Sequence, residues 1–348
     1  MNKTSHRGII VWLLTGCFLI FVMVIIGGIT RLTQSGLSMV EWKFTGSIPP
    51  LNEAEWSIQF EKYQHSPEYK LINSAFSLND FKHIFWWEFI HRFIGRTIGF
   101  VFIIPFCWFL IRKKIPPGFF KKIFFLFGLG LCQGMLGWIM VKSGLNKIPH
   151  VSHYLLAAHL ATAFATFGFT FWFALDLLFT ENEIRKSRSL KRKTILLLFL
   201  VSLQIIYGAF VAGMKAGSLF SNFPKMGDHW IAPEVFSMQP WWKNALENAA
   251  GVQFIHRILA VLIVITVIVI LVQSRKLFFP AGINIIIYVL CVTVLLQFIL
   301  GVLTLLLHVP VVISSLHQIG AFFLFSTTIL LFHRLYYLRN GISQHEQT

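Results

Sequence analysis

The sequence predicts an all-α membrane protein of eight transmembrane helices, arranged as two tandem, pseudo-twofold related four-helix bundles. Of its 348 residues, 56% are hydrophobic and only 13% are Asp, Glu, Lys or Arg, a balance that excludes an ordinary soluble domain. A bilayer core about 30 Å thick needs roughly 20 apolar residues per spanning helix. Eight runs of this kind occur, and motifs in the first half of the chain recur in the second half.

The expected spans cover residues 9–29, 86–111, 120–141, 154–178, 194–214, 252–273, 284–307 and 313–333. The first run has the position of a signal peptide, but it is about 21 residues long and lacks a small-residue cleavage site, so we expect a retained helix. No Arg-rich amphipathic transit peptide precedes it. This favours the inner membrane of a bacterium over the mitochondrial inner membrane.

The formal net charge is +16, and its distribution points to topology rather than to nucleic-acid binding. More than half of the 30 Lys and Arg residues lie in the two tails and in the loops after the second, fourth and sixth spans. By the positive-inside rule these segments face the cytoplasm, so both termini are expected there. Basic segments at this surface also attract anionic lipid.

All the cysteines fall inside expected spans: Cys17, Cys107, Cys132 and Cys291. None lies in an outer loop, so we expect no structural disulfide. Buried thiols of this kind usually serve as small apolar packing residues.

Several short motifs recur in the second half of the chain at a similar offset. The matched pairs are Glu88–Arg92 with Gln253–Arg257, Gln133–Gly137 with Gln297–Gly301 and, more loosely, Gly27–Arg31 with Ala212–Lys215. We therefore expect residues 1–180 to form the first bundle, with a long outer loop at 31–82. Residues 181–193 are the expected cytoplasmic linker, and residues 194–348 the second bundle.

Four histidines lie inside spans, within about two turns of the expected outer end: His91, His159, His256 and His317. Polar groups at membrane depth usually mark a functional site, and imidazole is a common axial ligand of haem iron in helix bundles. The repeat pairs His91 with His159, and His256 with His317. A plain hydrogen bond between helices is the alternative for any one of them, but four at one depth favour haem.

The residues beside these histidines differ between the halves. Glu88 shares a helix face with His91, whereas its counterpart Gln253 cannot ionise. We infer that the first half carries out chemistry and that the second half holds a redox haem; the alternative is an ion pair between Glu88 and Arg92. Arg92 and Arg257 are candidates to bind haem propionates, or else they reach toward lipid headgroups.

The motifs together resemble those of the haem A synthase family, and the match covers almost the whole chain. It is carried by Gly27–Ser38, Glu88–Arg92, Gln133–Trp138, Val151–His159, Asn222–Gly227, Val252–Arg257 and Leu316–Gln318. The chain resembles the mitochondrial-type branch, because it lacks the cysteine pair that other members carry in the first outer loop. His153 departs from the family pattern, and its role stays open.

The resemblance implies an oxidoreductase that converts haem O to haem A by successive hydroxylations of a ring methyl, which becomes a formyl group. It implies a b-type haem between His256 and His317, and a substrate haem held by His91 and His159. Glu88 and His91 would be the catalytic residues. Expected partners are haem O, delivered by haem O synthase, an unidentified electron donor and membrane lipid, but no nucleic acid; a homo-oligomer stays open.

Two other classes of protein fit the histidines and the repeat. One is a dihaem cytochrome b that only transfers electrons, and the other is a haem transporter or assembly chaperone. Neither requires the difference between Glu88 and Gln253. Only a synthase yields a haem that bears a formyl group.

Overall fold

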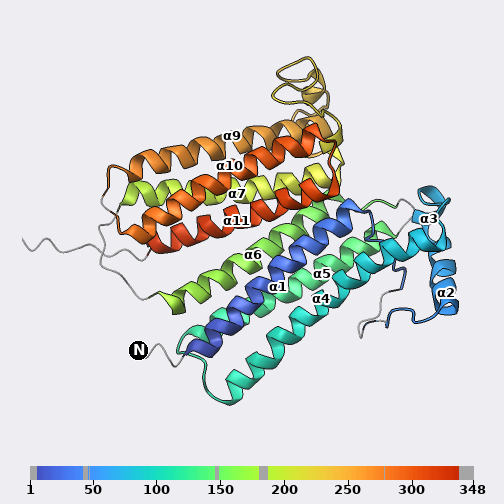
Figure 1. The fold of residues 1–348 in the computed structure, drawn as a ribbon, viewed down its shortest axis with the longest axis horizontal. Helices are drawn as coiled ribbons and strands as arrows, with labels where there is room; N and C mark the ends of the chain where they lie inside the picture. Colours follow the sequence, from blue (N-terminus) through green and yellow to red (C-terminus); the bar gives the residue numbers. More distant parts are fainter. Residues whose placement is uncertain are drawn as a thin grey trace, which may run out of the picture. The chain divides into compact units, whose positions relative to one another are not determined.

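The computed structural model describes residues 6–41, 46, 48–145, 149–179, 187–277 and 279–336, whose regular elements are all helices apart from an isolated β-bridge between Met226 and His229. Among them, eight helices are long and apolar enough to cross a membrane, which confirms the predicted number (Figure 1). They are α1 (Arg7–Leu32), α4 (Leu78–Ile111), α5 (Phe119–Gly144), α6 (His153–Leu178), α7 (Arg188–Gly213), α9 (Ala249–Ser274), α10 (Ala281–Leu306) and α11 (Val311–Tyr336). The free cysteines all lie in these helices, but the expected burial is wrong for Cys107 and Cys132, which are exposed on the helix surface.

The helices extend beyond the apolar runs where polar residues cap them. Helix α4 begins at Leu78 rather than 86, because the Ser77 hydroxyl accepts a hydrogen bond from the Asp80 amide while the Asp80 carboxylate accepts one from the Ser77 amide. Helix α7 begins at Arg188, inside the expected linker, behind a Ser187 cap. A hydropathy profile detects only the apolar part of a helix, so it does not predict these polar first turns. Residues 181–186 of the expected linker lie outside the described residues.

The chain separates into two compact units, Met1–Phe167 and Gly168–Thr348, with the division inside α6. In the first unit, α1 packs along α4. Pro105 lies inside α4 and has no N–H to donate to the carbonyl of Val101, one turn earlier. The indole N–H of Trp12 on α1 donates to that carbonyl instead, at 2.8 Å. This bond satisfies a backbone acceptor that would otherwise be unpaired in the membrane.

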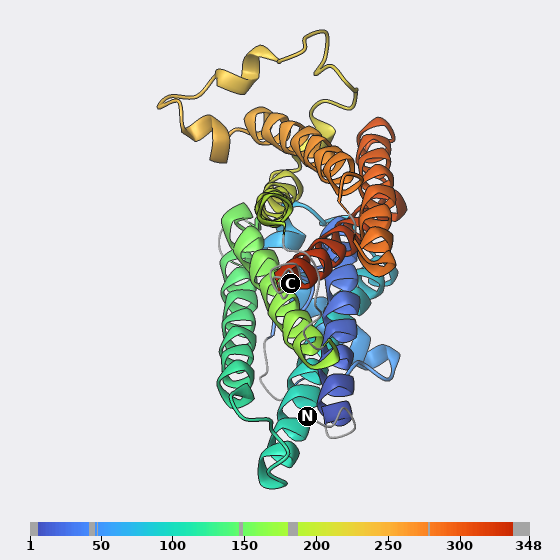
Figure 2. The same cartoon turned by 90° about the vertical axis from the view of Figure 1, so that its left-hand side faces the viewer.

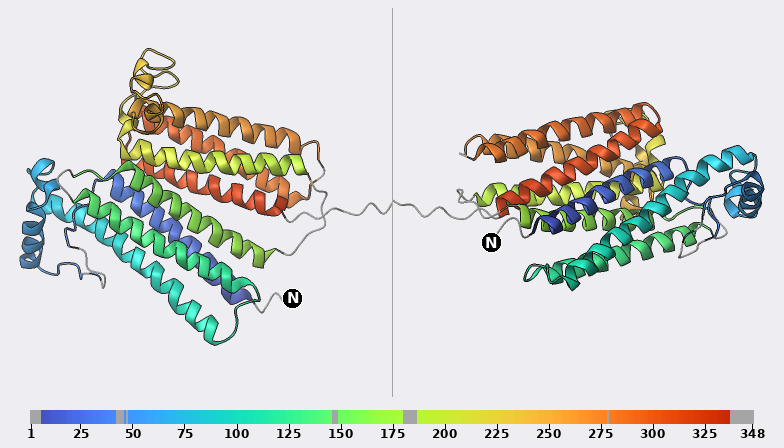
Figure 3. Two further views of the ribbon diagram at one scale, coloured as in Figure 1. Left: turned by 180° about the vertical axis from the view of Figure 1, so that it is seen from behind. Right: turned by 60° about the horizontal axis from the view of Figure 1, so that its bottom comes forward.

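Two short helices follow α1: α2 (Glu53–Gln64) packs on the first turns of α4, and α3 (Pro67–Leu71) packs on α2 (Figure 3). An apolar cluster joins them to α4 and to the chain that follows α1. Its buried members are Met39, Trp56, Tyr63, Phe81, Ile84 and Phe85. We call this folded part of the 33–77 segment the loop domain. It fixes residues 38 and 39 against α4, close to Glu88.

In the second unit, α7 packs on α9, α10 packs on α11, and α11 also contacts α7. The segment between α7 and α9 contains η2 (Ala216–Ser218), η3 (Pro233–Phe236) and α8 (Lys243–Leu246). It extends beyond the first turn of α9 and is drawn in yellow to gold in Figure 2. Asn248 ends this segment and starts α9 by accepting hydrogen bonds from the amides of Ala250 and Gly251.

Candidate functional site

The predicted histidines of the first unit lie against neighbouring helices. His91 on α4 faces Gly27 on α1, so closely that a Cβ atom on Gly27 would lie 3.2 Å from the His91 Nε2. His159 on α6 faces Gly137 on α5, where the corresponding distance to its Cε1 is 3.0 Å. A glycine opposite each ring therefore makes room for an imidazole between helices.

The second unit repeats this arrangement. His256 on α9 faces Gly208 on α7, and His317 on α11 faces Gly301 on α10, with distances of 3.4 and 2.9 Å from the ring Cε1 to the Cβ positions. Both members of each histidine pair that the repeat predicted thus lie in one unit, and binding of a haem by each pair stays a prediction.

A glutamine stands beside three of the four rings. Its Nε2 lies 3.2 to 3.4 Å from the imidazole Nε2, in the pairs Gln133–His159, Gln204–His256 and Gln297–His317. Each glutamine precedes, by one helical turn, the glycine that faces the same ring. At the equivalent position on α1, one turn before Gly27, the chain has Met23. This geometry aligns Gly27 with Gly208, and not with Ala212 as the looser sequence match suggested.

The polar groups around these rings are only partly satisfied. Among the described residues, the Nδ1 atoms of His159, His256 and His317 are buried without a hydrogen-bond partner, as are the Oε1 atoms of Gln133, Gln204 and Gln297. Unpaired polar atoms in a membrane interior are costly. No group of three or more His, Cys, Asp or Glu suited to a metal ion occurs in the described part of the chain. The second unit has two such imidazoles and the first unit has one, on His159. Unsatisfied imidazole nitrogens fit a haem, whose iron takes two axial ligands.

Glu88 is buried, with 2% of its surface exposed, and both of its carboxylate oxygens accept hydrogen bonds. Its Oε2 accepts from the Ser38 hydroxyl at 2.6 Å and from the Met39 amide at 2.7 Å. Its Oε1 accepts from the Arg92 guanidinium at 2.5 Å. Arg92 also donates to the carbonyls of Met39 and Glu41. Such donors stabilise the ionised carboxylate.

The second unit has no carboxylate at this position. Gln253 is buried and donates to the carbonyl of Phe220 at 3.1 Å. Arg257 donates to the carbonyls of Phe220 and Lys225, at 3.0 and 2.9 Å. Both arginines therefore hold the adjoining loop to the helix, but only Arg92 also pairs with an acid. Binding of propionates by either arginine stays a prediction.

Sequence reasoning missed one buried histidine. His333 on α11 is 1% exposed and lies 3.0 Å from the carboxylate of Asp176 on α6, with the Trp172 ring 4.8 Å away between centroids. No local pattern joins residues so far apart in the chain. His153, whose role was open, begins α6 and its ring lies 4.1 Å from that of Tyr154, centroid to centroid.

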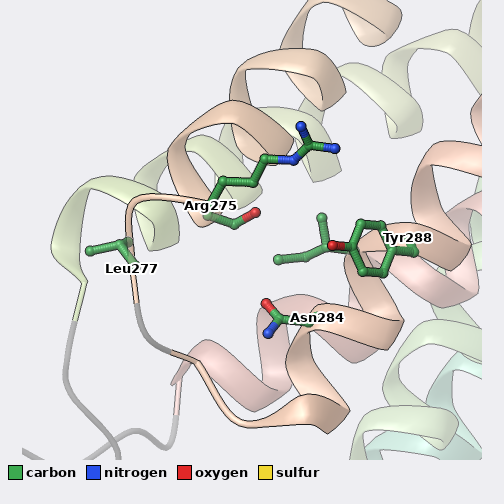
Figure 4. Close-up of a pocket in the computed structure, with 6 residues that line it drawn as sticks. Arg275, Leu277, Asn284 and Tyr288 are labelled. Atoms are coloured by element: carbon green, nitrogen blue, oxygen red, sulfur yellow. The ribbon is translucent and has the colours of Figure 1, made fainter.

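A separate pocket of about 240 Å³ lies where α9 ends and α10 begins. Arg275 and Leu277 line it from the α9 side, and Asn284 and Tyr288 line it from α10 (Figure 4). His256 lies near the start of α9, and His317 lies against Gly301 near the end of α10. The pocket is at the opposite ends of these two helices, so it is not part of the histidine site.

Comparison with known proteins decides the family. The family model COX15-CtaA, described as cytochrome oxidase assembly protein, matches residues 10–329. The chain belongs to this family. It is 46% identical over 341 residues to the haem A synthase of Flavobacterium psychrophilum, covering 95% of this chain and 98% of the relative. It is 42% identical over 343 residues to haem A synthase COX15 of Arabidopsis thaliana, covering 95% of this chain and 75% of the relative.

A third relative of the COX15-CtaA family is the haem A synthase of Nitrosospira multiformis, 43% identical over 334 residues, with 95% of this chain and 94% of the relative covered. Family membership agrees with the resemblance drawn from the motifs. It also gives the histidine pairs a chemical context, since the relatives are named for a haem.

Proposed function

We propose that this member of the COX15-CtaA family converts haem O to haem A, oxidising a ring methyl to a formyl group by successive hydroxylations. In this proposal the first unit holds the substrate haem between His91 and His159, and the second unit holds a haem b between His256 and His317. The observation that carries it is the asymmetry between two similar sites: Glu88, with its bound arginine, stands one turn before His91, whereas Gln253 stands before His256.

The haems supply the iron and redox chemistry when they are bound. The protein residues do the rest. His91 and His159 orient the substrate, because the glycines opposite them fix both rings between helices. Glu88 accepts hydrogen bonds from Arg92, Ser38 and the Met39 amide, which hold its carboxyl group in place to accept a proton or to stabilise positive charge that develops on the ring methyl.

Access from the membrane fits the substrate. Haem O carries an apolar tail, and burial of apolar surface favours delivery from the lipid side. Gly99 on α4 and Gly134 on α5 have no atom within 4 Å of a Cβ position, so the helix surfaces are open two turns after His91 and one turn before Gly137. Delivery by haem O synthase and an electron donor to the second unit complete the proposed cycle.

We also infer the topology from the distribution of charge. The helix ends near the four histidines face outward, with the loop domain on the outer surface, and both termini face the cytoplasm of a bacterial inner membrane. The basic residues at the other helix ends support this orientation. The missing cysteine pair in the 31–82 loop supports the mitochondrial-type branch.

Replacing Glu88 with Gln tests the proposal, because the amide keeps the shape of the side chain but cannot ionise. The full-length protein is expressed beside a source of haem O, and the extracted haems are separated by chromatography. We expect haem O to accumulate and haem A to fall at least a hundredfold, the usual contribution of a positioned acid or base. Undiminished haem A would reject the role of Glu88. A protein that binds haem but never yields a formyl derivative would instead be an electron-transfer cytochrome or a carrier.

A further inference from the structure

A groove between two membrane helices of the second unit lies away from the histidine site. Helix α7 packs on α9, and near the start of α7 and the end of α9 they form a pocket of about 320 Å³. It is lined by Lys193 of α7, and by Ile268, Val269, Val272, Gln273 and Lys276 of α9 and the turn after it. The three aliphatic side chains are exposed on the helix surface. The groove is therefore apolar toward the middle of the membrane and basic at its end.

The ammonium group of Lys193 is held in place across the two helices. Its Nζ donates to the Gln273 Oε1 on α9 at 2.5 Å, and to the Ser189 hydroxyl one turn earlier on α7 at 2.9 Å. Both acceptors are neutral, so they leave the positive charge uncompensated. An ammonium has three N–H donors, and these two bonds leave one of them for a ligand in the groove.

No carboxylate neutralises the two lysines of the groove in the described part of the second unit. The acids described there are Asp176, Asp228, Glu234 and Glu247. The last three lie in the segment between α7 and α9, which is at the other end of both helices. Asp176 pairs with His333, 3.0 Å away. Clefts lined by one sign of charge concentrate ions of the opposite sign, so the groove favours an anion.

The apolar lining distinguishes a lipid from a small soluble anion. Ile268 precedes Ser274, the last residue of α9, by six positions, which is about 9 Å along a helix. The aliphatic side chains therefore lie at the depth of hydrocarbon, whereas lysines at the end of a membrane helix reach the headgroups. Basic pockets between membrane helices bind anionic headgroups. A free anion would leave the aliphatic part of the groove unused.

We propose that this groove binds one anionic phospholipid. Lys193 and Lys276 hold its phosphate by charge-assisted hydrogen bonds, and one acyl chain lies along the three aliphatic side chains. A zwitterionic lipid has the same phosphate and chains, but its own cation cancels the phosphate charge, so two lysines without a carboxylate favour the anionic lipid. Because Lys193 belongs to α7 and the rest of the groove to α9, the lipid joins these helices at the end opposite to His256.

Binding is measured on the full-length protein in an uncharged detergent, by mass spectrometry of the intact complexes during titration with phosphatidylglycerol or phosphatidylcholine. We expect wild type to prefer phosphatidylglycerol. The double variant Lys193→Gln, Lys276→Gln should bind it about thirtyfold more weakly, since each basic residue near an anionic surface contributes about a fivefold factor. Arg188→Gln, Arg192→Gln is the matched control, because it removes the same charge from exposed positions on α7 outside the groove. An equal loss in the control would reveal only a general attraction to a basic surface and would overturn the site.

Lys276→Gln alone separates lipid binding from helix packing. Lys276 is exposed after the end of α9, so this variant keeps the hydrogen bond between Lys193 and Gln273. Its melting temperature without lipid should equal that of wild type, while its affinity for phosphatidylglycerol falls about fivefold. Wild-type affinity in this variant would contradict a phosphate held by both lysines.

Val272→Trp tests the place of the acyl chain, because the larger side chain fills the groove and leaves both lysines intact. Val292→Trp, at an exposed position on α10, is its control. We expect only Val272→Trp to weaken the binding of phosphatidylglycerol. Unchanged binding in Val272→Trp would overturn the proposed groove.

Inorganic phosphate distinguishes a lipid from a free anion. A ligand that binds only the folded protein raises its melting temperature. We expect phosphatidylglycerol to raise that of wild type and inorganic phosphate at the same concentration to leave it unchanged. An equal rise with phosphate would identify a simple anion site and overturn the lipid. None of these measurements uses turnover, so their outcome is independent of the proposed haem chemistry.

Discussion

Gly301 on α10 faces His317 on α11 so closely that a Cβ atom there would lie 2.9 Å from the ring. The same relationship, at 3.0 to 3.4 Å, holds between each of the other three histidines and a glycine. Real Cβ contacts are essentially never below 3.0 Å, and contacts of 3.0 to 3.4 Å are tighter than nine in ten, so the glycines and the ring positions are coupled. In a close-packed interior a displaced ring costs about 1–3 kcal/mol.

Gly301→Ala should therefore displace His317 and weaken the binding of the haem b proposed for the second unit about tenfold, since 1.4 kcal/mol corresponds to a factor of ten. The measurement is the ratio of the haem b absorbance to protein after purification. Gly282→Ala, on the same helix, is the control, because nothing lies within 4 Å of its Cβ position. Equal haem content in both variants would show that the glycine does not set the ring position.

The Glu88–Arg92 pair predicts an asymmetry between the two arginines. Arg92→Ala leaves a buried carboxylate without its cation, which costs about 3–5 kcal/mol, whereas Arg257→Ala removes only bonds to carbonyls. Thermal unfolding in detergent should show the larger loss for Arg92→Ala. Adding Glu88→Gln to Arg92→Ala should restore part of the stability, and no restoration would argue against an ionised Glu88.

Glu68 on α3 is buried in the loop domain and predicts a pH dependence of stability. Burial raises its folded-state pKa to about 7, above the ordinary value of 4.5, so folding retains its proton where the unfolded chain has lost it. Its contribution to stability is fully present below pH 4.5 and is lost as the pH rises to about 7. Wild type should lose up to roughly 3 kcal/mol relative to Glu68→Gln over this range. The difference in melting temperature should be constant above pH 8; a difference independent of pH throughout would contradict the buried neutral acid.

The hydrogen bond from the Trp12 indole to the Val101 carbonyl predicts that the contribution of Trp12 to stability depends on Pro105. Trp12→Phe keeps an aromatic ring but leaves the Val101 carbonyl unpaired, which should destabilise the protein by about 1–3 kcal/mol. Pro105→Ala restores a backbone N–H that can reach this carbonyl. In that background Trp12→Phe should cost less, as measured by thermal unfolding of the four proteins. Equal costs in both backgrounds would show that the indole serves only as packing.

Much of the fold was predictable because hydropathy and membrane thickness determine the number of spans. The ends of α4 and α7 were not, because caps at Ser77 and Ser187 extend the helices into polar sequence. The histidine positions and the difference between Glu88 and Gln253 were visible in the repeat.

Other features needed three-dimensional information. Gln204 and Met23 each precede an equivalent glycine by one turn. The first and fifth spans could not be aligned from sequence, because their apolar residues give no distinctive pattern. In the sequence nothing distinguishes Glu68 from a solvent-exposed acid, but the folded loop domain buries it. His333 and Asp176 meet only because α6 and α11 pack together.

The central claim is that the two histidine pairs hold two different haems. It is tested most directly by comparing the visible spectrum and extracted haems of His91→Ala and His256→Ala, each purified after expression beside a haem O source. The account predicts that His91→Ala keeps haem b and yields no haem A, whereas His256→Ala loses haem b. If both variants lost the same haem, or if His91→Ala still produced haem A, the assignment of the two sites would be wrong.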